Sequence, residues 1–157
     1  MDTKQNVRIS ILDRLLDHEP ENSQENVQFR LADFRHIQSM VIRDLEHLLN
    51  TRCGIHEPPK AYSETRRSVL YYGLRDYSSD SPDSGETRDR MIQDVEQAIR
   101  WFEPRLKSVR VQLDVEENTH RSLNFKISGL LVVDPIREPV TFDSYYDPDK
   151  KAYVISG

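Results

Sequence analysis

The sequence predicts an α+β fold: two main amphipathic helices packed on a small antiparallel β-meander, with a short N-terminal docking helix. Two stretches with apolar residues three and four positions apart indicate the helices. After Pro104 the apolar period changes to two, which is typical of strands with one face on a core. At 157 residues, we expect one domain at 26–157 preceded by an N-terminal arm at 1–25.

The composition favours a modest core with much solvated surface, since 36% of the residues are apolar and 31% are charged. A net charge of −5 argues against a nucleic-acid partner, because nothing offsets the repulsion from phosphates. No apolar run approaches the roughly 20 residues of a membrane span, and residues 1–6 are too polar for a signal peptide. The single Cys53 rules out an internal disulfide framework. We therefore expect a cytoplasmic protein without direct membrane insertion.

The arm contains a short helical pattern at 9–17, in which Leu12, Leu15 and Leu16 form one apolar face. So short a helix is marginal alone and needs a surface on which to dock. Residues 18–25 are polar and are typical of a linker. The helix is expected either to cover the core of its own domain or to dock on a partner.

The longest periodic segment runs from about 26 to 50 and should end at Cys53-Gly54, with the glycine as its C-cap. Residues 54–67 have no periodicity and are expected to form a loop. In the apolar stretch that follows, Gly73 predicts a sharp turn or a close approach of two backbones. The two predicted helices present these apolar residues to the core: Val27, Leu31, Phe34, Ile37, Val41, Leu45 and Leu48 in the first, and Met91, Ile92, Val95, Ala98, Ile99 and Phe102 in the second.

The second helix should stop at Glu103, because Pro104 disfavours helical backbone in the residue before it. A carboxylate is poorly placed at a helix C-terminus. Glu103 is therefore expected either to pair with Arg105 or to be held for a basic group of a partner. The plainer alternative is an incidental surface ion pair that contributes little to stability.

Four strands are predicted after Pro104, at about 107–117, 121–133, 140–146 and 152–155, with a bulge or bend at Gly129. The first two should form a hairpin. Free edges are expected among residues 138–156 or beside 107–117, each a row of unpaired amides and carbonyls that could accept a strand.

The patterns of known enzymes are absent, so no catalytic residue, cofactor or metal is expected. The five histidines are scattered, and Cys53 with His56 is only an isolated pair. A glycosidase needs a protonated carboxylic acid, whereas Arg105 favours the ionised form of Glu103. Several tyrosines remain outside the predicted core and would suit either its margin or an interface: Tyr71, Tyr72, Tyr77, Tyr145 and Tyr146.

Three motifs occur in order along the chain: Ile-Leu-Asp-Arg-Leu-Leu at 11–16, Ser-Val-Leu-x-Tyr-Gly-Leu-x-Asp at 68–76, and Phe-Glu-Pro-Arg-Leu at 102–106. With them the chain resembles the TssE family of small wedge subunits in the bacterial type VI secretion baseplate, which belongs to the phage-tail wedge proteins once labelled lysozyme-like. The resemblance covers nearly the whole length. One departure is Arg75, where the family often has proline.

The resemblance implies a structural subunit that helps to anchor and initiate the contractile sheath. Its partners would be TssF and TssG, through them TssK, and the sheath subunits TssB and TssC. Sheath initiation would use an edge of the sheet. The alternative, following the old label, is a muralytic glycoside hydrolase. The resemblance and the motifs together suggest these partner-binding residues: Leu12, Leu15, Leu16, Tyr72, Gly73, Glu103, Pro104 and Arg105.

Overall fold

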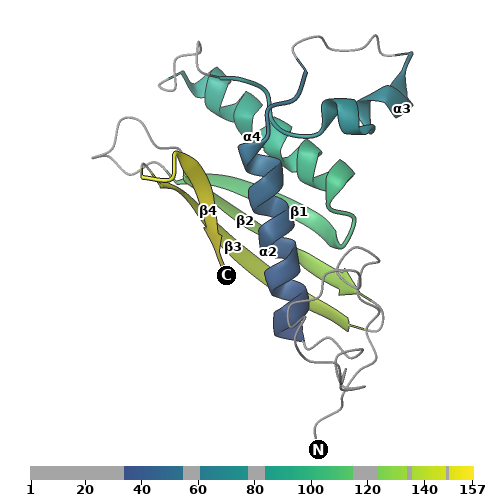
Figure 1. The fold of residues 1–157 in the computed structure, drawn as a ribbon, viewed down its shortest axis with the longest axis vertical. Coiled ribbons are helices and arrows are strands. Elements are labelled where there is room, and N and C mark those ends of the chain that lie inside the picture. The colour runs from purple at the N-terminus through teal and green to yellow at the C-terminus, as the bar shows by residue number, and fades with distance from the viewer. Residues whose placement is uncertain (1–33, 55–60, 78–83, 115–123, 134–135, 148) are drawn as a thin grey trace, which may run out of the picture.

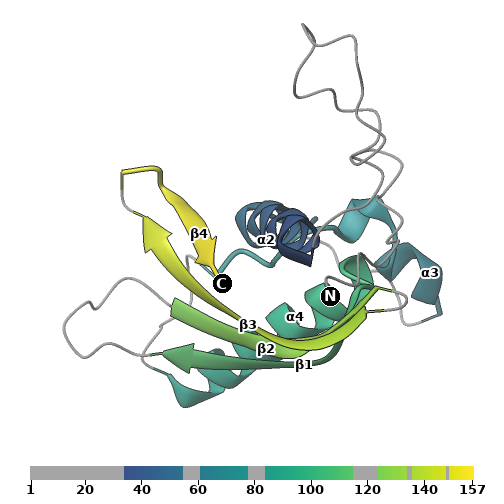
Figure 2. The same ribbon diagram turned by 90° about the horizontal axis from the view of Figure 1, so that it is seen from below.

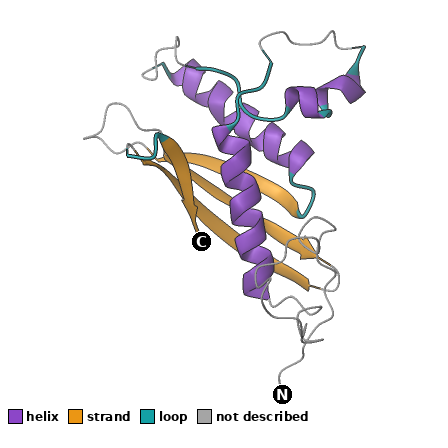
Figure 3. Ribbon diagram, viewed as in Figure 1, coloured by secondary structure: helices purple, strands orange, loops and turns teal. Residues whose placement is uncertain are grey.

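A computed structural model of the protein describes residues 34–54, 61–77, 84–114, 124–133, 136–147 and 149–157. Helices cover a four-stranded antiparallel meander with the strand order β1-β2-β3-β4, which confirms the predicted α+β class (Figures 1 and 3). The predicted arm and its short helix lie outside the described residues. The elements are α2 (Phe34–Asn50), α3 (Ser63–Arg66), the 3-10 helix η2 (Val69–Tyr71), α4 (Gly85–Phe102), β1 (Leu106–Asp114), β2 (Asn124–Val133), β3 (Ile136–Asp147) and β4 (Ala152–Ser156).

The sheet is strongly curved, and α2 lies in the hollow of the curve (Figure 2). One row of side chains crosses three strands on this inner face, because Val111 pairs with Ile127 and Ile127 with Phe142, and all three are buried. The apolar stripes of α2 and α4 close the same core. Apolar residues recur every three to four positions in these helices and every second position in the strands. This difference is why the sequence predicts both the helical layer and the sheet.

Strand β1 contains a β-bulge, which lets apolar residues on both sides of it face the core. Leu106 and Val109 are both buried, although three positions apart on a regular strand they would face opposite sides. The register against β2 shifts between Lys107 and Arg110, and Ser108 adopts a left-handed φ of 52°. Gly129 lies opposite, where an added Cβ would be 3.1 Å from the Lys107 carbonyl oxygen. The irregularity predicted at Gly129 is thus in the partner strand.

Helix α2 ends at Asn50, as predicted, but the predicted C-cap at Gly54 is wrong. Two side chains satisfy the last carbonyls instead: Asn50 Nδ2 donates to the Glu46 carbonyl at 2.8 Å, and Thr51 Oγ1 donates to that of His47 at 2.7 Å. The chain then runs beside Leu74, whose N–H donates to the Thr51 carbonyl at 2.9 Å.

The outward groups of both edge strands carry hydrogen bonds from helix side chains. On β4, Asn50 Oδ1 accepts from the Tyr153 N–H at 2.7 Å, and Asn50 Nδ2 donates to the Tyr153 carbonyl at 2.9 Å. Glu46 Oε1 accepts from the Ile155 N–H at 2.9 Å. On β1, Glu96 Oε1 accepts from the Val111 N–H at 3.0 Å. The expected row of unpaired amides is therefore wrong at these three strand residues, because α2 and α4 cover the edges.

Gly73 offers a test of the close approach that the sequence predicts and the structure confirms. Its φ is +110°, and an added Cβ would be 2.4 Å from the Thr51 carbonyl oxygen. Gly73→Ala should lower the free energy of unfolding by about 3 kcal/mol through strain and overlap. Gly85→Ala is the matched control, since nothing lies within 4 Å of its added Cβ. Urea unfolding of both variants makes the comparison, and equal stability would contradict the expected overlap.

Candidate functional site

The candidate site is the turn from α4 into β1, hereafter the Glu-Pro-Arg corner (Glu103, Pro104 and Arg105). The Glu103 N–H still donates to the Ile99 carbonyl at 2.8 Å, as the last hydrogen bond of α4. Pro104 has no N–H and cannot continue the helix. The Leu106 N–H then donates to the Glu103 carbonyl at 3.1 Å and closes the turn. The predicted stop of the helix at Glu103 is confirmed.

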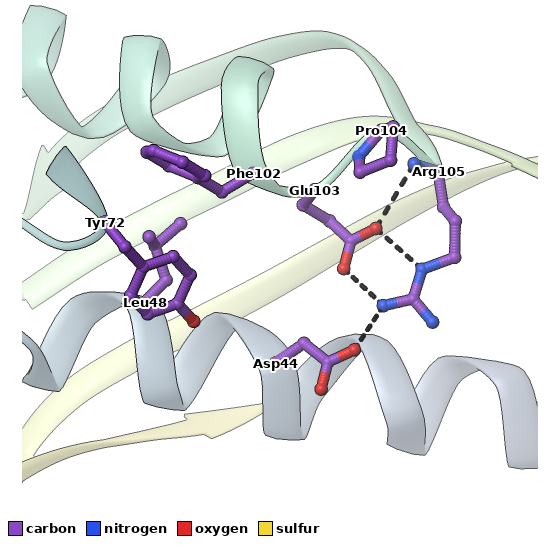
Figure 4. A pocket seen from close by; sticks show the side chains of 7 residues that line it. All are labelled: Asp44, Leu48, Tyr72, Phe102, Glu103, Pro104 and Arg105. Atoms are coloured by element: carbon purple, nitrogen blue, oxygen red, sulfur yellow. Dashed lines mark hydrogen bonds and ion pairs between the residues drawn. The ribbon is translucent and has the colours of Figure 1, made fainter. Parts of the chain in front are cut away.

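The Arg105 guanidinium joins two carboxylates from different elements (Figure 4). Its Nε donates to Glu103 Oε1 at 2.6 Å, and its Nη2 donates to Glu103 Oε2, which makes a two-bond fork. Nη2 also donates to Asp44 Oδ2 on α2 at 2.5 Å. The predicted pairing of Glu103 with Arg105 is confirmed. Asp44 is not among the predicted site residues, because it is 61 residues away along the chain.

Glu103 is only 2% exposed, so its charge belongs to the interior of the protein. The alternative of an incidental surface ion pair is therefore wrong, because it requires an exposed Glu103 carboxylate. The physical reason is that α2 packs over the corner, which excludes water from the carboxylate. Burial alone would lower the pKa of Arg105, but its hydrogen bonds and charge attraction to Glu103 and Asp44 outweigh burial and raise the pKa above its ordinary value.

Asp44 extends the network to a second arginine. Arg43 donates to Asp44 Oδ1 from Nε at 3.2 Å and from Nη2 at 3.1 Å. The four side chains Arg43, Asp44, Arg105 and Glu103 thus form a chain of alternating and balanced charge. It ties α2 to the end of α4 and the start of β1, while the Arg105 carbonyl accepts from the Val132 N–H of β2 at 2.8 Å.

A hollow of about 430 Å³ opens beside the corner. The Tyr72 ring meets Phe102 edge-on, with centroids 5.2 Å apart. Burial raises the pKa of Tyr72, and the carboxylates of Asp44 and Glu103 raise it further. The hollow is lined by Asp44, Leu48, Tyr72, Phe102, Glu103, Pro104 and Arg105 (Figure 4).

The structure thus brings four of the predicted partner-binding residues to one hollow: Tyr72, Glu103, Pro104 and Arg105. Gly73 is next in the chain and is buried against Thr51. The other three predicted residues, Leu12, Leu15 and Leu16, lie outside the described part of the chain. Partner binding at all eight positions stays a prediction.

The turn after Gly73 is held to α4 by charged and polar contacts. Arg75 Nε lies 3.3 Å from Asp94 Oδ2, and the Tyr77 hydroxyl donates to the same oxygen. Burial and this hydrogen bond raise the pKa of Tyr77. Arg75, the departure from the motif, is thus accommodated by an acidic partner on α4.

The chemistry available at the hollow is limited, because both of its carboxylates are bonded to arginine. General acid catalysis requires a carboxyl group that keeps its proton. Among the residues that the structure describes, no three His, Cys, Asp or Glu side chains are grouped to hold a metal ion. None of the described helices is long and apolar enough to cross a membrane. The geometry is that of a structural joint.

Comparison with known proteins gives one family. The model of the family "Baseplate wedge protein gp25" matches residues 35–136. A solved structure described as "The baseplate complex from the type VI secretion system" aligns over 71% of this chain and 94% of its own, with 16% identity and a TM-score of 0.48. That likeness is too weak to support an argument. No curated protein matches the chain.

The burial of Glu103 predicts how stability responds when its partner is lost. Arg105→Met leaves the Glu103 carboxylate in the interior without its cationic partner, which should cost about 3–5 kcal/mol of unfolding free energy. Adding Glu103→Gln should restore part of that loss, because the second change removes the stranded charge.

Arg90→Met is the matched control for this series. It removes an arginine whose side chain is 50% exposed and pairs with Glu86 one turn away. Its effect should stay within about 0.5 kcal/mol. Urea unfolding measures all the variants, and an Arg105→Met protein as stable as Arg90→Met would refute the structural role.

Proposed function

The chain belongs to the family of the baseplate wedge protein gp25, and from this premise we propose that it is a structural subunit of the type VI secretion baseplate wedge that helps to anchor and initiate the contractile sheath. One observation carries the proposal. The family match spans α2, α4, the Glu-Pro-Arg corner and β1, so it includes Arg105 and both carboxylates that the guanidinium joins. A charge-balanced network built on one buried carboxylate suits a part whose task is to keep a fixed shape.

The proposed partners are TssF and TssG, through them TssK, and the sheath subunits TssB and TssC, at the cytoplasmic face of the inner membrane. At the corner, Pro104 is exposed and the Arg105 side chain is 22% exposed. We propose that these two residues, with Tyr72 across the hollow, touch a partner. Glu103 is a positioning residue, because its buried carboxylate holds Arg105 in place.

We further propose that the protein has no muralytic activity. The geometry of the corner supports this, since Glu103 and Asp44 both accept hydrogen bonds from arginine and neither is placed as a proton donor. Purified protein is expected to leave peptidoglycan intact. Cleavage that disappears in Glu103→Gln, with assembly unchanged, would establish the enzymatic alternative.

Sheath initiation through an edge of the sheet requires that the side-chain hydrogen bonds covering that edge be broken. We call these hydrogen bonds, of Glu96 with β1 and of Asn50 and Glu46 with β4, the seals. An added strand would displace Glu96 from Val111 on β1, or Asn50 and Glu46 from β4. Backbone hydrogen bonds to the incoming strand would replace those lost. We therefore propose that the free subunit keeps its edges closed, and that one of them opens when the sheath is engaged.

The N-terminal arm gives a test of wedge assembly. A triple variant with Leu12, Leu15 and Leu16 changed to serine should fold as the wild type does, because a helix so short contributes little without a partner. Its binding to purified TssF–TssG complex should fall at least tenfold, as measured by interferometry. Changing Asp13, Asp17 and Glu19 to serine is the control for the polar side of the arm. Wild-type binding by the leucine variant would exclude the arm from the interface.

The two seals give a test of the route to the sheath. Glu96→Ala frees the Val111 N–H of β1, and Asn50→Ala frees the Tyr153 N–H and carbonyl of β4. The variant that opens the edge in use should nucleate sheath on purified baseplates about fivefold faster, since one hydrogen bond is worth about 1 kcal/mol net. The other variant serves as the control. Unchanged nucleation in both would mean that no strand is added.

A further inference from the structure

Exposed apolar side chains gather on the segment that contains α3 and η2. Val69 is 84% exposed, Leu70 is 69% exposed and Tyr62 is 61% exposed. Of the four large apolar side chains that are exposed among the described residues, these are three; the fourth is Tyr145. We call this surface (Tyr62, Val69 and Leu70) the α3–η2 tip. Single exposed apolar residues are ordinary, but three within nine residues make this segment a candidate for an interaction surface.

The tip projects from the body of the protein, since α3 lies at one end of the molecule away from the sheet (Figure 1). Its backbone nevertheless has a defined shape. The Tyr71 N–H donates to the Ser68 carbonyl at 2.9 Å, and the Tyr72 N–H donates to that of Val69 at 3.2 Å. Ser68 Oγ donates to the Thr65 carbonyl at 2.7 Å.

The chain is anchored immediately after the tip. Tyr72 packs on Phe102, and Leu74 is 6% exposed with its N–H and carbonyl bonded to Thr51 and Cys53. Val69 and Leu70 are therefore presented on a short projection that is already fixed at its base. A partner that binds a pre-formed projection has little conformational entropy to remove.

The charge around the tip differs from that of the whole chain. The described residues of 51–54 and 61–77 contain four arginines and two carboxylates, whereas the chain carries a net charge of −5; one of the four, Arg75, is paired with Asp94 on α4. Arg67 is exposed and lies two residues before Val69. The complementary surface is an apolar groove with acidic side chains at its rim.

We propose that the α3–η2 tip inserts Val69 and Leu70 into an apolar groove with an acidic rim on another protein of the same assembly. The inference rests on the proposed function for the assembly and adds a surface to it. A partner protein suits the tip better than a lipid bilayer does. Peripheral membrane helices present a long apolar face, whereas η2 has three residues.

The test is a double variant, Val69→Ser with Leu70→Ser. Both side chains are already in water, so the urea midpoint should not change. Binding to purified TssF–TssG complex should fall at least tenfold, and Arg67→Glu should weaken binding and reduce its dependence on salt. Tyr145→Ser is the matched control, since it removes an exposed aromatic residue from the sheet, and it should bind as the wild type does.

The possible results separate this inference from the proposed function. If wild-type protein binds the complex and the double variant binds equally well, the tip is not the docking surface. If wild-type protein does not bind the complex at all, the proposed function itself fails. If the wild type binds vesicles of anionic phospholipid and the double variant does not, the proposed groove on a partner protein is wrong and the tip binds a membrane. If the wild type forms dimers and the double variant does not, the tip binds a second copy of this chain.

Discussion

The position of α2 depends on one buried carboxylate. Glu103 is shielded from water at the end of α4, and a charge in that setting must be neutralised by a partner with good geometry. Arg105 is the partner. Its Nη2 also donates a hydrogen bond to Asp44 Oδ2, which holds α2 against the corner. Once α2 is placed there, its C-terminal Asn50 lies beside Tyr153 of β4. The ion pair at Asp44, within the helix, and the hydrogen bonds of Asn50 at its C-terminal end thus both fix α2 on the rest of the fold.

The sequence predicts those features whose causes are local. Alternation of apolar residues gives the strands, Pro104 gives the end of α4, and Gly73 gives the close approach to Thr51. The features that it does not predict join distant residues. Asp44 is 61 positions from Arg105, and Asn50 is 103 positions from Tyr153. No periodicity connects such pairs, so the burial of Glu103 and the closure of β4 required the packed structure.

The wrong prediction for the C-cap of α2 has a local cause. The helix ends at Asn50 as predicted, but Asn50 and Thr51 donate side-chain hydrogen bonds to carbonyls of its last turns, so Gly54 is not needed as a cap. Residues 51–54 instead run beside Leu74, where Arg52 forms a bridge with Leu74. That pairing supports the base of the α3–η2 tip.

The edge residues that helix side chains cover and the exposed apolar tip differ in how selective a contact each allows. A free sheet edge pairs with almost any extended chain, because backbone groups are the same in every protein. Apolar side chains on a fixed projection are selective, because only a groove of matching shape and charge accepts them. Under the proposed function, the free subunit would therefore be recognised through side chains until an edge opens for the sheath. The Glu103–Arg105–Asp44 contacts support this arrangement, since their directional hydrogen bonds hold α2 against the turn from α4 into β1.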